Sequence, residues 1–522
     1  MTPRDIKILL MMTILSLLFA LILGRMFIFS IVQYNYPTAG KNILSGDRIK
    51  RRSIVDRNYN LIAGDVETKT LYINGDLLED ESLVAEKLSK IIGLDRRQIH
   101  SKLTNRNTKS RYILIKRHIF PEEESKIRQL PIASVVFENS LLRYYPHDNL
   151  FSHAVGYVNV DGRGMLGLEE YYDEYLKNAS GDHLRTTLDI RIQSVLREEL
   201  QRAKEFYRAN FVVGIVGDID TGNILATVSL PDFNPNDPND RLNTFNHASY
   251  GNYELGSILK VFTIANGLEL GLIGENSRFD VTRDIGHGKF LIGDIDSIRN
   301  RETLSTGEVL ALSSNIGIAL IAKKIGIGRQ LEFFESIGML EKLDTDIRQV
   351  SLPIQPRKWK DINLMTIAYG YGVAVSPLHA LSALGGIVGG AVVAPRFSYG
   401  FRPQRKVRKI SKKTSELIRK FLRLVVTGGT GRLAHIDGYD IGGKTGTARK
   451  MSVGGYQKGA HLASFFGAWP IGNPRYSIII VIDRPKEPSR KDADGTGGSV
   501  AAPIAKDIIL KITPFLEMEP IK

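Results

Sequence analysis

Three short patterns in this sequence combine residue types that could transfer an acyl group through a serine. They are Ser257-Ile-Leu-Lys260, Ser313-Ser-Asn315 and Lys444-Thr-Gly-Thr447, and each occurs once in the chain. The first offers a hydroxyl nucleophile and an amine on the same side of a helix. The second offers polar groups for proton transfer. The third offers hydroxyls and N–H groups on a strand, which can bind a carboxylate and an oxyanion.

Ser257 is predicted to be the nucleophile because it follows Gly256 at the start of a helical pattern, where free N–H groups stabilise developing negative charge. Lys260 lies three residues further on and is predicted to be the base, provided that burial and nearby positive charge lower its pKa. The alternative interpretation is a serine N-cap followed by a solvated lysine. We prefer the catalytic interpretation because the other two patterns accompany this one.

Ser313 and Asn315 interrupt an apolar helical pattern that runs from Val309 to Ile321. A Ser-Ser-Asn cluster suits a helix end with satisfied polar groups, or it serves a site. Beside a serine nucleophile we favour the site. Ser313 could then relay a proton to the leaving amine, and Asn315 could hold a substrate amide.

The third pattern is predicted to lie on a strand, with Lys444 as a further catalytic residue. Alternation places the Thr445 and Thr447 hydroxyls on one face, where they could bind a carboxylate, and the Thr447 N–H could form an oxyanion hole with that of Ser257. Gly446 has no side chain, so a substrate could approach the strand edge as an added strand. A glycine-threonine turn is the alternative interpretation.

Composition limits the classes of function. The chain has 522 residues, which suggests two or three domains, and 43% of them are hydrophobic. The net charge of +14 favours an anionic partner, but the basic residues are scattered, so we expect no nucleic-acid binding. The absence of cysteine excludes disulfides and thiolate chemistry. We expect no metal ion and no cofactor.

The N-terminal segment predicts a membrane anchor. Residues 8–32 form an apolar stretch that is interrupted by Arg25. This stretch is long enough for a transmembrane helix, which would follow a cytoplasmic tail of residues 1–7. A cleaved signal peptide would have a shorter apolar region and a small-residue cleavage site. Basic residues on both sides leave the charge rule for orientation undecided. The catalytic domain is expected outside the cytoplasm, because its substrate would be extracytoplasmic.

The remaining chain predicts an elongated α+β pedestal over residues 40–195 and a catalytic α+β domain over residues 200–522. The pedestal carries a helical pattern between Glu81 and Arg128. In the catalytic domain, helical pattern dominates from Leu259 to about Leu384. Five strands are predicted around it, and they suggest an antiparallel sheet flanked by helices: Phe211–Asp220, Asn223–Ser229, Tyr439–Arg449, Leu462–Trp469 and Tyr476–Asp483.

The sequence resembles the class B penicillin-binding proteins from the predicted anchor to the C-terminus. The resemblance implies a D,D-transpeptidase that cross-links peptidoglycan stem peptides and is acylated by β-lactams. It also implies a fold of anchor, pedestal and transpeptidase domain, with the anchor in the bacterial inner membrane and the catalytic domain in the periplasm. Beyond the three patterns, the similar stretches are Ile54-Val-Asp-Arg57-Asn, Arg143-Tyr-Tyr-Pro146, Gly164-Met-Leu-Gly167-Leu-Glu169, Thr187-Leu-Asp189, Thr221-Gly-Asn-Ile-Leu-Ala226, Phe233-Asn-Pro-Asn236, Tyr371-Gly-Val-Ala-Val-Ser-Pro377-Leu and Gly498-Ser-Val-Ala-Ala-Pro503.

Within this class, the chain looks like the septal, FtsI-type division enzymes, because of its Arg-Tyr-Tyr-Pro stretch, Val158-Asn-Val-Asp161 and modest length. Two positions depart from the family pattern. Leu255 stands where proline is usual before Gly256, and Gly495-Thr496 stands where an aromatic pair is common. The first could shift the entry into the nucleophile helix, and the second could alter the rim of the cleft.

Other functions stay open at this point. An elongation-type enzyme, a β-lactamase or lactam sensor, and a catalytically vestigial scaffold would share some of these features. The family resemblance also implies a polytopic membrane glycosyltransferase and other division proteins as partners. We expect the pedestal and the anchor to dock the glycosyltransferase, through small residues at Gly24 and Ser30 and through the charges of Arg51 and Arg52.

Overall fold

The computed structural model describes residues 11–12, 15–16, 19, 50–105, 111–178, 181–287, 290–295, 298, 300–400, 406–452, 455–488 and 493–520. The predicted tail at 1–7 and most of the predicted anchor at 8–32 lie outside these residues. Within the described ranges, no helix combines the length and the apolar character needed to cross a bilayer.

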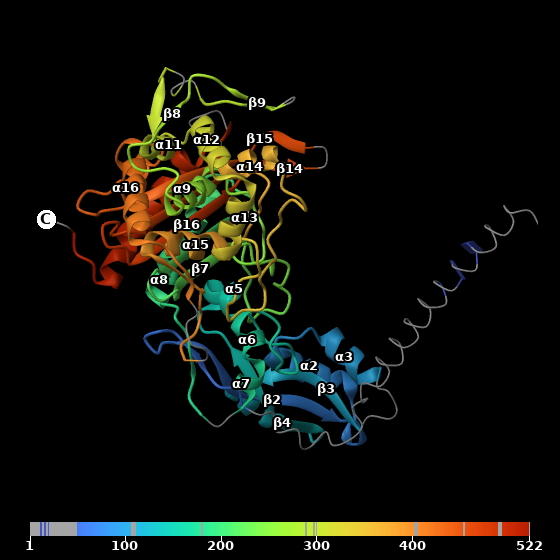
Figure 1. Cartoon of the computed structure of the whole chain (residues 1–522). Helices are drawn as coiled ribbons and strands as arrows, with labels where there is room; N and C mark the ends of the chain where they lie inside the picture. The colour runs from blue at the N-terminus through green and yellow to red at the C-terminus, as the bar shows by residue number, and fades with distance from the viewer. Residues whose placement is uncertain are drawn as a thin grey trace, which may run out of the picture. The chain divides into compact units, whose positions relative to one another are not determined.

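The chain divides into two compact units (Figure 1). The smaller unit contains Met1–Ile49 and Glu67–Leu142, and the larger contains Lys50–Val66 and Arg143–Lys522. The larger unit therefore takes in residues 143–195, which the sequence analysis assigned to the pedestal. The pedestal and transpeptidase bounds given above stay predictions of functional domains.

In the smaller unit, helices α2 (Glu81–Ile92), α3 (Arg96–Thr104) and α4 (Pro121–Arg128) accompany an antiparallel sheet. Strand β2 (Leu61–Asn74) enters this unit and pairs with β3 (Tyr112–Ile119) and β4 (Val135–Tyr144). The predicted helical pattern is confirmed in α2. Its buried residues include Val84, Leu88 and Ile92, which lie four apart on one face. Asp80 caps its first turn, and it ends at Gly93 with φ +67°.

The larger unit is built on a five-stranded antiparallel sheet, as predicted, and its strand order is β14-β15-β16-β6-β7. One strand matches its predicted bounds, but β15 begins seven residues earlier than predicted because it pairs with β14 through a polar hairpin. The strands are β6 (Val212–Asp218), β7 (Ile224–Leu230), β14 (Gly442–Ser452), β15 (Gly455–Trp469) and β16 (Tyr476–Asp483).

Both faces of this sheet are buried, which explains why its central strands are apolar at nearly every position. Along β16, Ile478, Ile480 and Ile482 pack with helices α8 (Ile190–Phe206) and α17 (Ala502–Ile512). The alternate residues, Ile479 and Val481, lie in the core on the other face. That core contains residues of α9 (Lys260–Glu269), α15 (Pro377–Gly389) and α16 (Lys412–Gly428).

The region between α9 and α15 is less uniformly helical than the sequence analysis predicted. It contains α11 (Thr306–Ala311), α12 (Asn315–Ile325), α13 (Ile327–Ser336) and α14 (Asp361–Tyr369). It also contains two small antiparallel ribbons, which lie at the top of Figure 1. Their three-residue strands are too short to show a period-2 pattern, so the residues there carry no strand signal. They are β8 (Arg278–Asp280), β9 (Ile285–His287), β10 (Phe290–Ile292) and β11 (Thr303–Ser305).

A buried ionic network links Arg51 and Asp65 to later segments of the larger unit. Glu169 is fully buried and accepts from Arg51 at 2.7 Å and from Arg143 at 2.6 Å. Arg143 also contacts Asp65 at 3.0 Å, and Arg51 contacts Asp173 at 2.8 Å. Buried charges require such mutual pairing.

This network corrects one expectation about docking. Arg51 is only 5% exposed and its guanidinium is held by Glu169 and Asp173, so its charge is not available to a partner. Arg52 is engaged as well, because it donates to the Asn178 carbonyl and lies over the Tyr175 ring. Both arginines therefore serve the fold of the larger unit.

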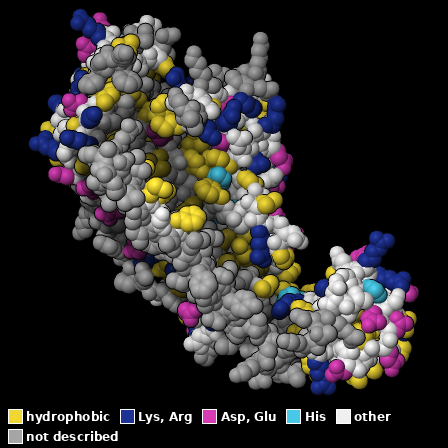
Figure 2. All heavy atoms as spheres, turned by 90° about the vertical axis from the view of Figure 1, so that its right-hand side faces the viewer, with side chains coloured by type: hydrophobic (Ala, Val, Ile, Leu, Met, Phe, Trp, Pro, Cys, Tyr) yellow, Lys and Arg dark blue, Asp and Glu magenta, His cyan; other side chains and the backbone are white. Residues whose placement is uncertain are grey.

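The larger unit exposes several large apolar side chains. Phe245 and Tyr250 stack edge to face at 5.5 Å, and each is about half exposed. Leu352 is 64% exposed and accepts a hydrogen bond from Asn252 at its carbonyl, so it lies near this pair. Hydrophobic side chains also gather in a band in the face that Figure 2 shows.

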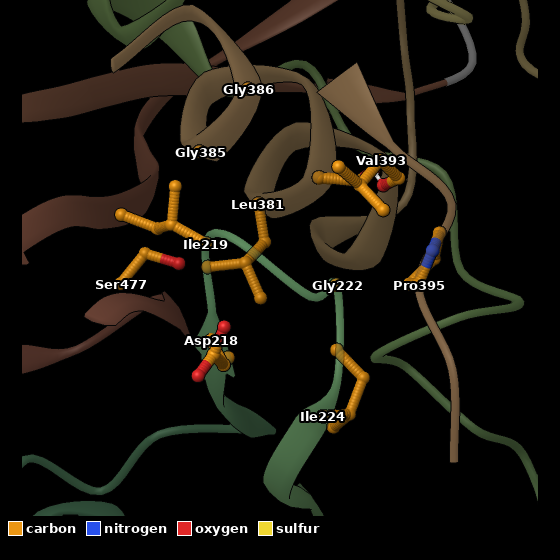
Figure 3. Close-up of a pocket in the computed structure, with 12 residues that line it drawn as sticks. Asp218, Ile219, Gly222, Ile224, Leu381, Gly385, Gly386, Val393, Pro395 and Ser477 are labelled. Atoms are coloured by element: carbon orange, nitrogen blue, oxygen red, sulfur yellow. Dashed lines mark hydrogen bonds between the residues drawn. The ribbon is translucent and has the colours of Figure 1, made fainter. Parts of the chain in front are cut away.

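A small cavity of about 20 Å³ lies between α15 and the turn that joins β6 to β7. Figure 3 shows Leu381, Ile219 and Asp218 around it, with Gly385 and Gly386 on the helix above. A Cβ on Gly385 would meet its nearest neighbours at 3.6 Å, which is ordinary contact. A Cβ on Gly386 would lie 2.3 Å from the Val392 backbone.

These two adjacent glycines provide a matched test of the packing. Gly385→Ala should stabilise the protein by about 0.5–1 kcal/mol, because it removes a helix-interior glycine and fills space. Gly386→Ala should destabilise it by at least ~1 kcal/mol, because the backbone of β12 (Ala391–Val393) must move. Urea denaturation of both variants measures the difference. Equal effects would contradict the described cavity.

Candidate active site

The predicted nucleophile lies at the start of a helical segment, as the sequence analysis expected. Ser257 belongs to the 3-10 turn η3 (Gly256–Leu259), which leads directly into α9. The N–H of Lys260 donates to the Ser257 carbonyl, so the two residues are one turn apart. Ser257 is partly exposed, whereas the Lys260 side chain is fully buried.

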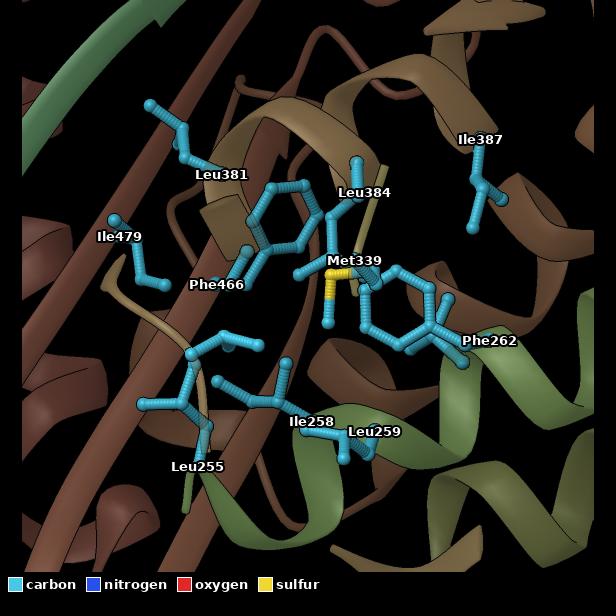
Figure 4. Close-up of a cluster of buried hydrophobic side chains, with 14 of the residues drawn as sticks. Leu255, Ile258, Leu259, Phe262, Met339, Leu381, Leu384, Ile387, Phe466 and Ile479 are labelled. Carbon is cyan, nitrogen blue, oxygen red and sulfur yellow. The ribbon is translucent and has the colours of Figure 1, made fainter. Parts of the chain in front are cut away.

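Apolar neighbours anchor this segment in the core. Figure 4 shows Ile258, Leu259 and Phe262 among side chains from α15 and from strands β15 and β16. All three are fully buried. Burying a side chain of this size contributes roughly 1.5–3 kcal/mol, so the core fixes the position of the turn that carries Ser257.

The structure brings four of the predicted catalytic residues together around one hydroxyl. Lys260 Nζ lies 3.2 Å from Ser313 Oγ and 2.8 Å from Asn315 Oδ1, and it also donates to the Ser313 carbonyl at 2.5 Å. Lys444 Nζ approaches the same Ser313 Oγ at 3.1 Å and donates to the Thr445 carbonyl at 2.8 Å. Lys444, which lies 131 positions after Ser313, thus shares this hydroxyl with Lys260.

Ser313 reaches this position through an unusual backbone conformation. Its φ is +63°, the left-handed region that non-glycine residues rarely adopt, and it lies between the end of α11 and the start of α12. Ser314 then caps α12 by accepting from the Gly317 N–H at 2.9 Å. The interpretation of this cluster as a helix end is therefore correct, and the same helix end places Ser313 between the two lysines.

Burial perturbs both lysines. It lowers the pKa of Lys260 to about 7, against the opposing effect of the nearby Asp294 carboxylate. It lowers the pKa of Lys444 far below its usual range, and the positive charge of Lys260 adds to this effect. Near neutral pH, at least one of the two amines is therefore neutral and able to accept the proton of a serine hydroxyl.

Glycines allow the third pattern to lie directly against the nucleophile segment. A Cβ on Gly256, whose φ is +59°, would lie 2.6 Å from the Thr447 carbonyl oxygen. A Cβ on Gly446 would lie 2.1 Å from the Leu255 carbonyl oxygen. Gly446 thus lets the strand contact the segment before Ser257. This role of the glycine differs from the predicted one, which was to let a substrate approach the strand edge.

The order of strands leaves β14 at an edge of the described sheet. The Arg449 N–H donates to the Tyr371 hydroxyl instead of to β15, so it points to the free edge. Because strand N–H groups alternate, the Thr447 N–H points to the same edge, close to Gly256 and Ser257. Two N–H donors could therefore face one oxygen atom there.

The two threonine hydroxyls of the pattern differ. Thr445 is 6% exposed and donates to Thr430 Oγ at 2.8 Å. Thr447 is more exposed and accepts from the Gly497 N–H at 3.0 Å, which leaves its own proton able to reach a ligand. The Thr447 hydroxyl can therefore bind a ligand directly, whereas the Thr445 hydroxyl is already hydrogen-bonded to Thr430.

A partly buried carboxyl lies three residues before Ser257. Glu254 Oε1 accepts from the Gly372 N–H at 2.6 Å and from the Tyr456 hydroxyl at 3.1 Å. Burial raises its pKa, and these two hydrogen bonds oppose that effect. The hydrogen bond from Tyr456 to Glu254 ties the hairpin of β14 and β15 to the segment before Ser257, and the Tyr371 and Tyr456 rings meet edge to face at 5.1 Å.

Sequence reasoning missed Asp294, Thr430 and Glu254 as neighbours of the site. Asp294 contacts Ser314 and Asn315, and Thr430 contacts Thr445. Neither Asp294 nor Thr430 lies within a catalytic pattern, so the sequence carried no signal for them. Glu254, directly before Leu255, could have been noticed as a carboxylate beside a predicted nucleophile.

The two departures from the family pattern also have structural roles. Leu255 is fully buried beside Ile258, and its carbonyl accepts from Ser464 Oγ at 3.3 Å. Thr496 caps the next turn by accepting from the Ser499 N–H at 3.2 Å. Neither residue displaces a predicted catalytic group.

The arrangement suits serine acyl transfer. It holds a hydroxyl at a helix start, two amines of lowered pKa, a shared hydroxyl between them and a free strand edge with N–H donors. Among the residues that the structure describes, no cluster of histidine and carboxylate side chains is suited to hold a metal ion.

Comparison with known proteins assigns a family to this fold and site. Residues 212–510 match the penicillin binding protein transpeptidase domain, and residues 48–217 match the penicillin-binding protein dimerisation domain. The chain is 30% identical over 485 residues to a probable peptidoglycan D,D-transpeptidase FtsI of Caulobacter vibrioides, covering 89% of this chain and 81% of that protein.

Two further relatives agree with this assignment. The chain is 24% identical to the peptidoglycan D,D-transpeptidase FtsI of Escherichia coli, covering 90% of this chain and 84% of that one. Its fold is similar to penicillin binding protein 3 of Mycobacterium tuberculosis in complex with aztreonam, with a TM-score of 0.71 and 23% identity over 91% of this chain and 98% of that one. The chain belongs to the class B penicillin-binding proteins and is of the FtsI type.

Proposed function

We propose that this chain is a septal peptidoglycan D,D-transpeptidase whose acyl-enzyme forms on Ser257. The observation that carries the proposal is the pair of buried lysines on the Ser313 hydroxyl, one of which, Lys260, lies one turn from Ser257. The names of the relatives and the match to the transpeptidase domain support the same reaction class.

Acylation would begin with neutral Lys260. It takes the Ser257 proton, and the Ser257 oxygen attacks the carbonyl carbon of the peptide bond between two D-residues of a stem peptide. The N–H groups of Ser257 and Thr447 stabilise the oxyanion. Protonated Lys260 returns the Ser257 proton through the Ser313 hydroxyl, which is hydrogen-bonded to both lysines, to the leaving amine, and the C–N bond breaks.

The second half of the reaction reverses these roles. The amine of a second stem peptide attacks the ester carbonyl, and the ester C–O bond breaks. The amine loses a proton to Ser313 and Lys260, and Lys260 returns a proton to the Ser257 oxygen. The Thr447 hydroxyl would bind the terminal carboxylate of the donor peptide, with Thr445 and Asn315 as the other substrate contacts. A β-lactam would enter the first half and remain as a slowly hydrolysed ester.

The compartment and the partners are part of this proposal. An anchor at residues 8–32 would hold the enzyme in the inner membrane with its catalytic domain in the periplasm. The proposed partners are stem peptides on the lipid-linked precursor and the nascent glycan, a polytopic membrane glycosyltransferase and other division proteins. With Arg51 buried, the docking hypothesis rests on the anchor and on the exposed surface of the pedestal.

Treatment of the purified protein with a β-lactam should give a single covalent adduct on Ser257. Intact-mass spectrometry measures the adduct, and peptide mapping locates it. Ser257→Ala should give none and should keep the thermal unfolding midpoint of the parent within a few degrees. Rapid turnover of the drug would favour a β-lactamase instead, and complete absence of an adduct would favour a vestigial scaffold.

The rate of this acylation should rise with pH through a midpoint near 7. Lys260 must be neutral to accept the serine proton, so acidification below its lowered pKa of about 7 removes the active form. The rate should fall about tenfold for each pH unit below the midpoint. Lys260→Met, which removes the amine at similar volume, should lose acylation by several orders of magnitude. A midpoint near 10 would contradict the role of a buried amine.

Docking through the anchor should depend on its small residues. Leucine at Gly24 and Ser30 should weaken co-purification with the membrane glycosyltransferase, because bulky side chains prevent close helix approach. Acylation of Ser257 should be unchanged. Leu18→Phe and Ile22→Phe provide a control on the same segment, because these residues face away from Gly24 in the predicted helix. Equal loss of binding in both pairs would contradict a specific docking face.

A further inference from the structure

Asp294 holds the residues that present Ser313 to the two lysines. It follows β10, and its side chain is 6% exposed. One carboxylate oxygen accepts from the Ser314 hydroxyl at 2.5 Å. The other accepts from the backbone N–H groups of Asn315 and Ile316. The neighbouring Gly293 carbonyl accepts from the Asn315 side-chain amide at 3.3 Å.

A buried carboxylate is costly unless hydrogen bonds and opposite charge compensate it. The N-terminus of α12, an eleven-residue helix, supplies both N–H donors and a favourable dipole. Ser314 already caps this helix through the Gly317 N–H, so the helix has a cap without Asp294. The carboxylate is therefore an additional contact, and it binds the three residues that follow Ser313.

The conformation of Ser313 needs such support. A left-handed φ in a non-glycine residue costs of order 1 kcal/mol or more and persists only where its surroundings fix it. Ser313 is held on one side by the end of α11, where its N–H donates to the Leu310 carbonyl. Asp294 fixes the other side, at Ser314 and Asn315.

Asp294 also acts on the lysines through its charge. Its carboxylate opposes the effect of burial on the pKa of Lys260, while Lys260 and Lys444 disfavour charge on each other. Asp294 and Lys444 are the charged groups that the described structure sets against Lys260. Without Asp294, the buried site would hold two amines and no compensating anion.

We infer that Asp294 is a positioning residue for acyl transfer, because its buried carboxylate fixes the turn at Ser313–Asn315 and balances the charge of the lysine pair. The inference rests on the proposed function, in which Lys260 and Ser313 move the protons. Asp294 itself need not touch the substrate. Its effect passes through the geometry of Ser313 and Asn315 and through the protonation of Lys260.

Asp294→Asn tests this role with little change in shape. The amide oxygen can still accept from the two backbone N–H groups, and the amide nitrogen can donate to the Ser314 hydroxyl, but the charge is gone. Asp346→Asn is a matched control. Asp346 is 7% exposed and likewise accepts from a serine hydroxyl, Ser398 at 2.5 Å, and from a backbone N–H, Phe397 at 2.7 Å.

The measurement is the second-order rate of β-lactam acylation from pH 5 to 9, together with thermal unfolding of each protein. Asp294→Asn should move the pH midpoint to lower pH, because the lost anion no longer favours protonated Lys260. Its plateau rate should fall roughly tenfold to a hundredfold, because Ser313 and Asn315 are held less firmly. Asp346→Asn should lose stability yet keep the parent midpoint and plateau.

The outcomes separate this inference from the proposed function. An unmodified protein that is never acylated would refute the proposed function itself. If the parent is acylated but Asp294→Asn keeps the parent midpoint, the inference about charge is overturned, whatever the stability. If Asp294→Asn and Asp346→Asn lose rate and stability in parallel with no shift of midpoint, Asp294 is only a fold contact.

Discussion

The burial of two amines around a single hydroxyl is the constraint on which the described site depends. Neither Lys260 nor Lys444 has any exposed surface, and both lie within hydrogen-bond distance of Ser313 Oγ. Two charged ammonium groups so placed would repel each other in a medium of low polarity, so one must give up its proton. A neutral amine can take the proton of a serine hydroxyl, as serine acyl transfer requires, and here burial produces such an amine.

The surrounding architecture maintains this constraint from three directions. The core under η3 fixes Lys260, the left-handed turn after α11 fixes Ser313, and the edge strand β14 fixes Lys444. The strand and the turn before Ser257 can meet closely only because Gly256 and Gly446 lack side chains. The glycines of the patterns are therefore as specific as the reactive residues, since any Cβ at these positions would overlap backbone atoms.

A second set of buried charges stabilises the fold of the larger unit. Glu169 joins Arg51 and Arg143, so the stretches that begin at Arg143 and Gly164 bind each other. This contact gives both stretches a structural role, although neither carries a catalytic group. It also removes Arg51 from the surface, which the sequence could not indicate because arginine side chains are mostly exposed.

The sequence by itself determined the family, the five strands of the sheet, the helical segment that carries Ser257 and the residues that are proposed to react. These features follow from local patterns: apolar runs for strands buried on both faces, and residue types at short spacing for the site. Only the tertiary structure decided the sharing of Ser313 by Lys260 and Lys444, the contacts of Asp294 and Thr430, and the burial of Arg51. Such contacts join residues far apart in the chain, and burial, which sets the lysine pKa values, is a property of the packed core and not of any short segment.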